Sequence, residues 1–416
     1  MLRMRRQGGS LSPSKVQCSP GTIESGRFIS NQYLCRFMFL ALIVILFYLP
    51  TTLTRHLLTY KRYYELPNQD MAQFCPRRYP GSKLDLGPGS YFIALNLHNS
   101  EKVVTYIIPQ IQRLIDALGP DRIFISIYES GSVDNTAQWL RIYRQFLDSH
   151  HIPNEVISDQ RSRSQQQHRI DYLSIIRNTV MAPLYQHRFK PDYVVFINDV
   201  FFCAEDVSRL GQRLIQGPHI NMACGLDLVS EPHSEILFYD KWAARDITGA
   251  ILSGNYPFFS RAQDVNRIKA GLPVPVYACW NGLTVVKAKV FDTVRFRSAP
   301  DGACLSSECT LFCQDVWKAT PGNIIIDPAV VVVYDEYSAA RLMNFPIAGI
   351  GDSSIPIVGT SPNPEPAPLF YDCMPMIGVN SEASRLRFLQ ESSSRSLNCW
   401  GFGHPLHISN RYDVAA

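Results

Sequence analysis

The chain has 416 residues, of which 46% are hydrophobic and 18% are charged, a composition typical of a folded protein with a large core. Its formal net charge of +4 is unevenly placed, because six basic residues and one acidic residue precede Phe37. The remainder is close to neutral, which argues against a nucleic-acid partner.

An unbroken apolar run covers residues 37–49 and, with its flanks, approaches the roughly 20 residues that a membrane-spanning helix needs. A core helix or a cleavable signal peptide are the alternatives. The long basic lead and the absence of a small-residue cleavage site after Leu49 favour a signal anchor. The basic flank then stays in the cytosol and the bulk of the chain faces the lumen. We therefore predict a cytosolic tail (1–36), a transmembrane anchor (37–53), a stem (54–89), a catalytic body (90–340) and a C-terminal extension (341–416).

The cysteines fit a lumenal body. Cys18 and Cys35 fall in the tail and its edge, so nine of the eleven cysteines remain, and some pairing is expected with at least one thiol left over. Cys304, Cys309 and Cys313 form a cluster, but no histidine lies at zinc-finger spacing. We interpret these three as disulfide-bonded or buried thiols.

Strands alternate with helices through the first half of the body. Apolar runs predict strands over residues 91–97, 122–128, 155–158 and 193–197, and helical periodicity predicts helices between them. Ser100 is positioned to cap the first helix. This βαβαβ alternation predicts a mostly parallel sheet with right-handed crossovers. Later strands are expected over 221–228, 283–286, 324–327 and 330–334, with a helix after Ser307.

The strand over residues 193–197 ends on Asn198 and Asp199, where polar side chains would lie at the carboxyl end of a central strand. A carboxylate there is well placed to hold a divalent cation against a diphosphate. The alternative is that Asp199 only caps a turn.

A polar loop over residues 129–136 follows the second strand and opens a helix. In it, Gly131 and Ser132 free the backbone, Asp134 can bond sugar hydroxyls or a base edge, and Thr136 can cap the helix. In a doubly wound sheet this is where a nucleotide binds. An ordinary polar turn is the alternative.

Together these features resemble the nucleotide-sugar half of GT-A glycosyltransferases. The order is Asn99-Ser-Glu after the first strand, the 129–136 loop after the second, then Arg177-Asn178 and Asn198-Asp199. The resemblance implies that the first two loops hold the nucleoside and that the acidic strand end holds Mn²⁺ or Mg²⁺ on the diphosphate. Such a cation neutralises charge on the departing diphosphate.

Over residues 90–340 the chain also resembles the fungal capsule-associated α-1,3-mannosyltransferase family, which includes the cryptococcal mannosyltransferases. The motifs that carry this resemblance are Phe196-Ile-Asn-Asp-Val-Phe, Ala223-Cys-Gly-Leu-Asp-Leu, Phe238-Tyr-Asp-x-Trp-x-x-Arg-Asp-x-x-Gly, Cys279-Trp-Asn-Gly and Ser307-Glu-Cys followed by Asp315. The resemblance implies a type II Golgi membrane enzyme that uses GDP-mannose, forms an α-1,3 linkage and retains anomeric configuration.

One position departs from the GT-A pattern, in which many members end this strand in Asp-x-Asp. Here the residues are Asn198-Asp199-Val200, so only one carboxylate is present. A further metal ligand would have to come from Glu205 or from a distant residue such as His404.

Several other candidates have a structural alternative. Asp227 is either a substrate contact or a turn carboxylate, and Arg245 with Asp246 either holds substrate or forms a surface ion pair. Asp315 is either near the reacting carbon or a charge at a helix N-terminus. Trp280 either stacks on a sugar or lies in the core.

We therefore predict a GT-A-like α/β fold, with a mostly parallel mixed sheet flanked by helices, that transfers mannose from GDP-mannose to a mannoside acceptor. Asp199 would bind Mn²⁺ or Mg²⁺. The predicted donor-binding residues are Asn99, Glu101, Glu129, Ser132, Asp134, Arg177 and Asn198; the catalytic residues Glu308, Asp315 and Asp227; and the substrate residues Arg245, Asp246, Trp280 and Asn281. The alternatives are a UDP-sugar transferase of the same fold and a catalytically silent scaffold for polysaccharide synthesis or export.

Overall fold

The computed structural model describes residues 71–160, 168–230, 235–300, 306–344, 346–373 and 411–413. Within these ranges, no helix combines the length and apolarity needed to cross a membrane. The predicted cytosolic tail and the anchor over residues 37–53 lie outside the described residues.

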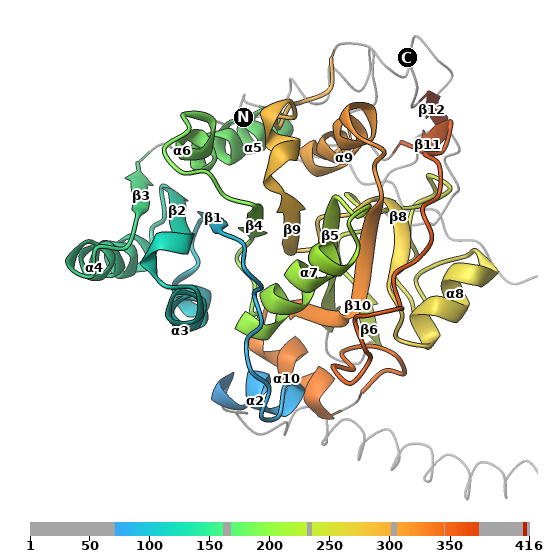
Figure 1. The fold of residues 1–416 in the computed structure, drawn as a ribbon, viewed down its shortest axis with the longest axis horizontal. Coiled ribbons are helices and arrows are strands. Elements are labelled where there is room, and N and C mark those ends of the chain that lie inside the picture. Colours follow the sequence, from blue (N-terminus) through green and yellow to red (C-terminus); the bar gives the residue numbers. More distant parts are fainter. Residues whose placement is uncertain are drawn as a thin grey trace, which may run out of the picture. The chain divides into compact units, whose positions relative to one another are not determined.

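The core of the fold is a ten-stranded mixed sheet in the order β3-β2-β1-β4-β9-β5-β10-β8-β7, with β6 paired to β5 (Figure 1). Strands β1 to β4 are mutually parallel, and β9 is inserted antiparallel between β4 and β5. The strands are β1 Tyr91–Leu97, β2 Ile123–Ser130, β3 Asn154–Asp159, β4 Tyr193–Ile197, β5 Met222–Ser230, β6 Ile236–Phe238, β7 Arg245–Asp246, β8 Val274–Ala278, β9 Leu283–Lys287 and β10 Ile324–Val333.

The predicted elements of the first half are confirmed nearly residue for residue, because long apolar runs separated by clear breaks leave little choice of secondary structure. In the second half, the two strands predicted over 324–327 and 330–334 form the single strand β10, which is interrupted by a register shift between Ile326 and Val331. Asp327 lies in that irregular stretch, where Arg209 and Arg213 pair with it.

Helices cover both faces of the sheet. Tyr91 of β1 contacts α7, whereas Asn96, five positions along the same strand, donates its amide to the Ile176 carbonyl of α5 at 3.2 Å. Side chains alternate between the faces of a strand, so α7 and α5 lie on opposite sides. The helices are α2 Phe74–Arg78, α3 Glu101–Leu118, α4 Thr136–Ser149, α5 Arg169–Val180, α6 Ala182–Tyr185, α7 Ala204–Gln216, α8 Ala262–Lys269, α9 Glu308–Ala319 and α10 Glu336–Asn344, with 3₁₀ turns Met71–Gln73, Pro120–Arg122 and Ala288–Asp292.

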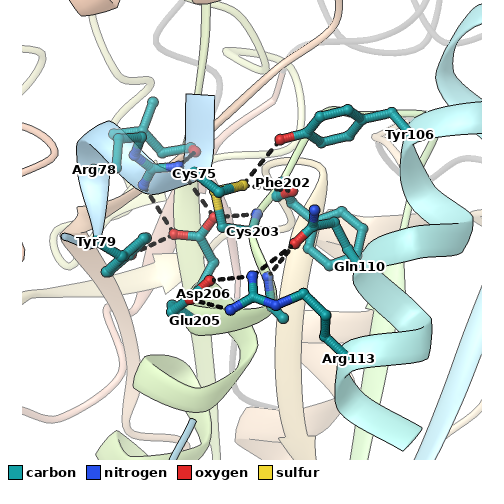
Figure 2. Close-up of a disulfide and its surroundings, with 12 residues drawn as sticks. Cys75, Arg78, Tyr79, Tyr106, Gln110, Arg113, Phe202, Cys203, Glu205 and Asp206 are labelled. Atoms are coloured by element: carbon teal, nitrogen blue, oxygen red, sulfur yellow. Dashed lines mark hydrogen bonds and ion pairs between the residues drawn. A yellow bond between two sulfur atoms is a disulfide. The ribbon is translucent and has the colours of Figure 1, made fainter. Parts of the chain in front are cut away.

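A buried junction ties α2 to the start of α7 (Figure 2). A disulfide joins Cys75 to Cys203. Beside it, Asp206 accepts hydrogen bonds from Arg78 Nη2 at 2.8 Å, from the Tyr79 hydroxyl at 2.5 Å and from the Cys203 backbone N–H at 2.7 Å. Burial raises the pKa of Asp206, and the charge of Arg78 together with these hydrogen bonds partly offsets that increase. The junction fixes the chain only four residues after Asp199.

The main core extends beyond the predicted body at both ends. Phe74 and Cys75 are buried in it, so the described part of the predicted stem packs with the body. At the other end, Tyr371 is buried in the same core, and the short strand β11 Phe370–Asp372 pairs with β12 Arg411–Asp413. Residues 341–373 are therefore part of the body as well.

Pairing of the cysteines is confirmed. Besides Cys75–Cys203, a second disulfide joins Cys224 to Cys279, and Cys373 is also disulfide-bonded. Cys309 and Cys313 are buried free thiols, which excludes exposed reactive roles for them, and Cys304 lies outside the described residues.

Candidate functional site

The sheet has a topological switch point between β1 and β4. From β1 the chain moves through β2 to β3 on one side, then returns to place β4 on the other side of β1. Connections that leave the carboxyl ends of two such strands in opposite directions open a crevice, where open α/β sheets bind ligands. The crevice is flanked by His98 and Asn99 after β1, and by Asn198 and Asp199 after β4.

The loops after β1 and β2 are held together by hydrogen bonds. The Asn99 backbone N–H donates to Ser132 Oγ at 2.9 Å, and the Val133 N–H donates to Asn99 Oδ1 at 2.8 Å. Glu101 Oε1 accepts from Asn135 Nδ2 at 2.8 Å, and the buried Glu129 accepts from the Ser132 backbone N–H. Four of the predicted donor-binding residues, Asn99, Glu101, Glu129 and Ser132, are thus brought together at one edge of the sheet.

Asp134, a predicted donor-binding residue, accepts hydrogen bonds at the starts of two helices. One carboxylate oxygen accepts from the Glu101 N–H at 3.0 Å and the other from the Thr136 N–H at 3.0 Å. Burial opposes the charge, but the hydrogen bonds from Thr136 and Glu101 lower the pKa of Asp134. Asp134 therefore caps the starts of both α3 and α4, whereas Ser100, the predicted cap of α3, makes no side-chain capping bond.

Asp199 is partly exposed in the crevice. Burial raises the pKa of its carboxyl, while Arg177, His98 and Arg169 favour the charged form. The described residues contain no group of three or more His, Cys, Asp or Glu side chains arranged to hold a metal ion. A cation at Asp199 would thus take one protein carboxylate and complete its shell with phosphate oxygens and water, an arrangement that Mg²⁺ accepts.

The proposed additional ligand Glu205 is excluded by its contacts. It is buried, and both of its carboxylate oxygens pair with Arg113, Oε2 at 2.9 Å from Nη1. Figure 2 shows this pair beside Asp206, on the α7 side of the Cys75–Cys203 junction. The other candidate ligand, His404, lies outside the described residues.

Arg177 of α5 connects three elements beneath the crevice. Its Nε donates to Glu308 Oε1 at 2.8 Å, and its Nη1 contacts Asn198 Oδ1 at 3.4 Å. Its guanidinium carbon lies 4.9 Å from the ring centroids of both Phe196 and Trp280. The aromatic faces and the carboxylate together stabilise this buried cation. Arg177, Asn198 and Glu308, each a predicted site residue, are thus in contact.

Two carboxylates on the β5 side extend this network. Asp227 is fully buried; its Oδ1 accepts from the Asp240 N–H at 3.3 Å and its Oδ2 from the Tyr334 hydroxyl at 3.4 Å. Burial, together with the charge of Asp240, raises the pKa of Asp227 well above its usual range. Burial also raises the pKa of Asp240, and the negative charge of Glu308 adds to this increase. Asn198 hydrogen-bonds the Tyr334 hydroxyl, which links both halves of the network.

Asp240, Tyr334 and Tyr239 were not predicted as site residues. Asp240 belongs to the motif Phe238-Tyr-Asp and directly follows a short apolar run. That position at a strand end is the sequence feature that could have indicated a site residue. Tyr334 was placed only at the end of a predicted strand, and nothing in its spacing indicates the contact with Asp227, 107 residues earlier.

Arg245 and Asp246, the predicted substrate residues, are both buried. Arg245 is fully buried, and its guanidinium donates to backbone carbonyls, including Asp372 O at 2.7 Å and Ala244 O at 2.7 Å. Burial lowers its pKa to about 10. Asp246 Oδ1 accepts from the Thr248 N–H at 2.8 Å and so closes a local turn. Both residues hold the chain rather than a ligand.

Trp280 and Asn281, also predicted as substrate residues, lie in the core. Both are fully buried: Trp280 packs edge-to-face on Phe196, Phe296 and Phe312, and the Asn281 amide donates to Gly225 O at 2.8 Å. An indole enclosed by three rings has no face for a sugar. From its place in the core, the Trp280 ring contacts the guanidinium of Arg177.

Asp315 does not join the crevice residues. It lies two turns beyond Glu308 on α9 and forms a two-point ion pair with Arg297, whose Nε donates to Oδ2 at 2.6 Å and whose Nη2 donates to Oδ1 at 2.9 Å. The Asp315 carboxylate, predicted to lie near the reacting carbon, is thus paired with Arg297 in this structure.

The family model described as Cryptococcal mannosyltransferase 1 matches residues 90–315, which include every crevice residue except Tyr334. The chain belongs to this family. A relative, the alpha-1,3-mannosyltransferase CMT1 of Cryptococcus neoformans var. neoformans serotype D, is 27% identical over 275 residues, which are 59% of this chain and 58% of that protein. The match thus covers little more than half of the relative's length.

Solved structures with a related arrangement are more distant. Mannosyltransferase PcManGT from Pyrobaculum calidifontis, in complex with GDP-Man and Mn²⁺, is 11% identical with a TM-score of 0.36, over 69% of this chain and 71% of that chain. GalNAc-T7 with UDP, GalNAc and Mn²⁺ is 12% identical with a TM-score of 0.39, over 60% and 44%. At such scores these similarities carry no argument about the reaction.

Proposed function

We propose that this chain is an α-1,3-mannosyltransferase with a GT-A-like fold, which transfers mannose from GDP-mannose to a mannoside acceptor with retention of configuration. The observation that carries the proposal is the position of Asp199 at the switch point between β1 and β4, in a chain that belongs to a mannosyltransferase family. The polar loops after β1 and β2 lie along the same edge and are the proposed nucleoside site.

The residues present fit a divalent cation at Asp199. Asp199 would hold Mn²⁺ or Mg²⁺, which supplies positive charge to the departing diphosphate. Arg169 and His98 are exposed and close enough to favour the Asp199 anion, so they lie where phosphate oxygens would arrive. The buried Arg177–Glu308 pair fixes Asn198 beside Asp199 and keeps the strand end in one position.

In the proposed reaction, the acceptor 3-hydroxyl oxygen forms a bond to the anomeric carbon of mannose, and the bond from that carbon to the phosphate oxygen breaks. The departing phosphate takes the acceptor proton, so GDP leaves from the same face that the acceptor enters. This route needs no covalent nucleophile. On the β5 side of Asp199, the partly exposed Asp240 is the proposed sugar contact, and the fully buried Asp227 positions it by accepting its backbone N–H.

The proposed setting is the Golgi membrane, with the body in the lumen and a role in fungal cell-surface or capsule glycan synthesis. The disulfides Cys75–Cys203 and Cys224–Cys279 support a secretory compartment, because disulfides persist where the environment is oxidising.

The test is a donor screen with the purified full chain, using GDP-mannose and UDP-sugars, with Mn²⁺, Mg²⁺ or a chelator, followed by linkage analysis of the product. We expect mannose transfer in an α-1,3 linkage, and a loss of at least about 100-fold in kcat/KM for Asp199→Ala. Asp121→Ala, an exposed aspartate in the 3₁₀ turn before β2, is the matched control.

Each contrary outcome has its own meaning. Transfer from a UDP-sugar alone would replace the donor assignment. Absence of both binding and transfer for every donor would favour a scaffold role. Full activity of Asp199→Ala would overturn the metal assignment while leaving the transferase proposal intact.

A further inference from the structure

Tyr239 presents an aromatic ring to solvent beside the buried carboxylates of the candidate site. Tyr239 is 53% exposed, although the preceding Phe238 is buried and the backbone N–H of the following Asp240 donates to Asp227 Oδ1. A single exposed aromatic side chain is common on protein surfaces, so exposure alone does not mark a ligand contact. Tyr239 differs by its position, because its backbone is hydrogen-bonded to Asp227 of the candidate site.

The ring is held in place from two directions. Its centroid lies 4.5 Å from that of Tyr334, with the planes tilted by 45°. The backbone N–H of Tyr239 donates to Asp227 O at 3.0 Å, and its carbonyl accepts from the Lys241 N–H at 2.9 Å. The backbone bonds fix the Tyr239 main chain and the Tyr334 ring restricts its side chain, which lowers the entropic cost of binding a ligand.

The ring also lies within electrostatic range of the whole acidic cluster. Burial raises the pKa of the Tyr239 phenol, and the charges of Asp227, Asp240 and Asp199 raise it further. Burial and the same three carboxylates also raise the pKa of the Tyr334 phenol. Tyr239 thus borders the site that contains Asp199, on its β5 side.

We propose that Tyr239 is the platform on which the acceptor sugar stacks. One face of a pyranose ring is lined with C–H groups and packs on an aromatic face, while its hydroxyls donate to nearby carboxylates. Asp240, partly exposed and adjacent in sequence, is the carboxylate positioned to receive them.

The strand order distinguishes the acceptor from the donor. Along the edge of the sheet lie the loops of β2 and β1, then Asp199 after β4, then Asp227 on β5 and Tyr334 directly after β10. A donor anchored by its nucleoside at β1–β2 and by its diphosphate at Asp199 directs its sugar toward the β5 side. Tyr239 is exposed on that side, so an incoming glycan can reach it from solvent.

This inference rests on the proposed mannosyl transfer, so the test separates the two. Steady-state kinetics of the full chain would use GDP-mannose with methyl α-mannoside or α-1,3-mannobiose as acceptor, for wild type, Tyr239→Ala and Tyr239→Phe. Trp139→Ala, which removes an exposed aromatic on α4, is the matched control. Thermal unfolding of each variant checks that it is folded.

We expect Tyr239→Ala to raise the acceptor KM by about tenfold or more, a loss on the scale of one good contact. Donor KM and donor affinity should stay unchanged, and Tyr239→Phe should behave as wild type because the ring face is retained. An unchanged acceptor KM in Tyr239→Ala, or a rise in donor KM instead, would overturn the platform.

A wild-type chain that transfers no sugar would contradict the proposed function instead. In that case, saturation-transfer NMR with mannobiose still decides the inference. A signal in wild type that is lost in Tyr239→Ala but kept in Trp139→Ala supports it, and equal signals, or none in wild type, overturn it.

Discussion

Arg177 and Glu308 form a buried ion pair, in which Arg177 Nε donates to Glu308 Oε1 at 2.8 Å. The pair joins α5 to the first residue of α9, across 131 positions of the chain. It lies directly behind Asn198, so the position of the candidate metal carboxylate depends on it.

Removing one partner of this pair should destabilise the protein strongly. Glu308→Ala leaves the buried guanidinium of Arg177 without its countercharge, and we expect a loss of about 3–5 kcal/mol in the free energy of unfolding. Denaturant titration of the single variants and of Arg177→Met/Glu308→Leu measures this. The double variant should recover much of the loss, and a double variant as unstable as the sum of the singles would contradict a coupled pair.

Asn198 should not tolerate replacement by aspartate. The Asn198 amide offers an oxygen to Arg177 and a donor to the Tyr334 hydroxyl, which leaves that hydroxyl free to donate to Asp227. A carboxylate supplies no donor, so the Tyr334 hydroxyl would have to choose between two acceptors. We expect Asn198→Asp to lower kcat/KM by about tenfold, in accord with the loss of one hydrogen bond at a buried site.

The contrary result for Asn198→Asp would be informative. If the variant is more active and binds Mn²⁺ more tightly than wild type, then the second carboxylate acts as a metal ligand and the amide has no special role. Calorimetric titration of Mn²⁺ in the presence of GDP measures the affinity directly.

Asp227 should make stability depend on pH. Its pKa in the folded chain is raised, mainly by burial, so the folded state binds a proton that the unfolded state loses above about pH 4. Its contribution to stability is therefore fully present below that pH and declines as the pH rises toward the folded-state pKa. An asparagine resembles the protonated acid and removes this decline.

In wild type, Asp227 makes the melting temperature at pH 7.5 lower relative to that at pH 5. We expect Asp227→Asn to remove this part of the pH dependence and to reduce transfer activity. Differential scanning calorimetry at the two pH values provides the measurement. Identical pH profiles for wild type and variant would show that Asp227 does not titrate in this window.

The Cys75–Cys203 disulfide should contribute to the stability of the body without changing the rate of the transfer reaction. The two cysteines are 128 residues apart, so their bond restricts a long loop of the unfolded chain. Cys75→Ala/Cys203→Ala should lose about 2–4 kcal/mol of unfolding free energy. Each single variant should cost about as much as the pair, because either change breaks the bridge. A double variant with an unchanged denaturation midpoint would exclude this role.

Local sequence determined the parallel half of the sheet. The runs at 91–97 and 193–197 are apolar on both faces, so they can only be central strands, and the polar residues after them must then lie at one edge. This is why the motifs predict a common location for the residues that follow these strands. Of those residues, Asn198 contacts Arg177, which pairs with Glu308.

Only the tertiary structure decided which polar residues face a ligand. Arg245, Trp280 and Asp315 occur in motifs as suggestive as that of Asp199, but burial and partners distant in sequence assign them to the interior or to an ion pair with Arg297. Tyr239 shows the reverse, since a residue beside an apolar run is exposed because Tyr334, 95 positions later, occupies the space beneath it. Sequence patterns report the periodicity of one element, whereas the exposure of a side chain depends on which other elements pack against it.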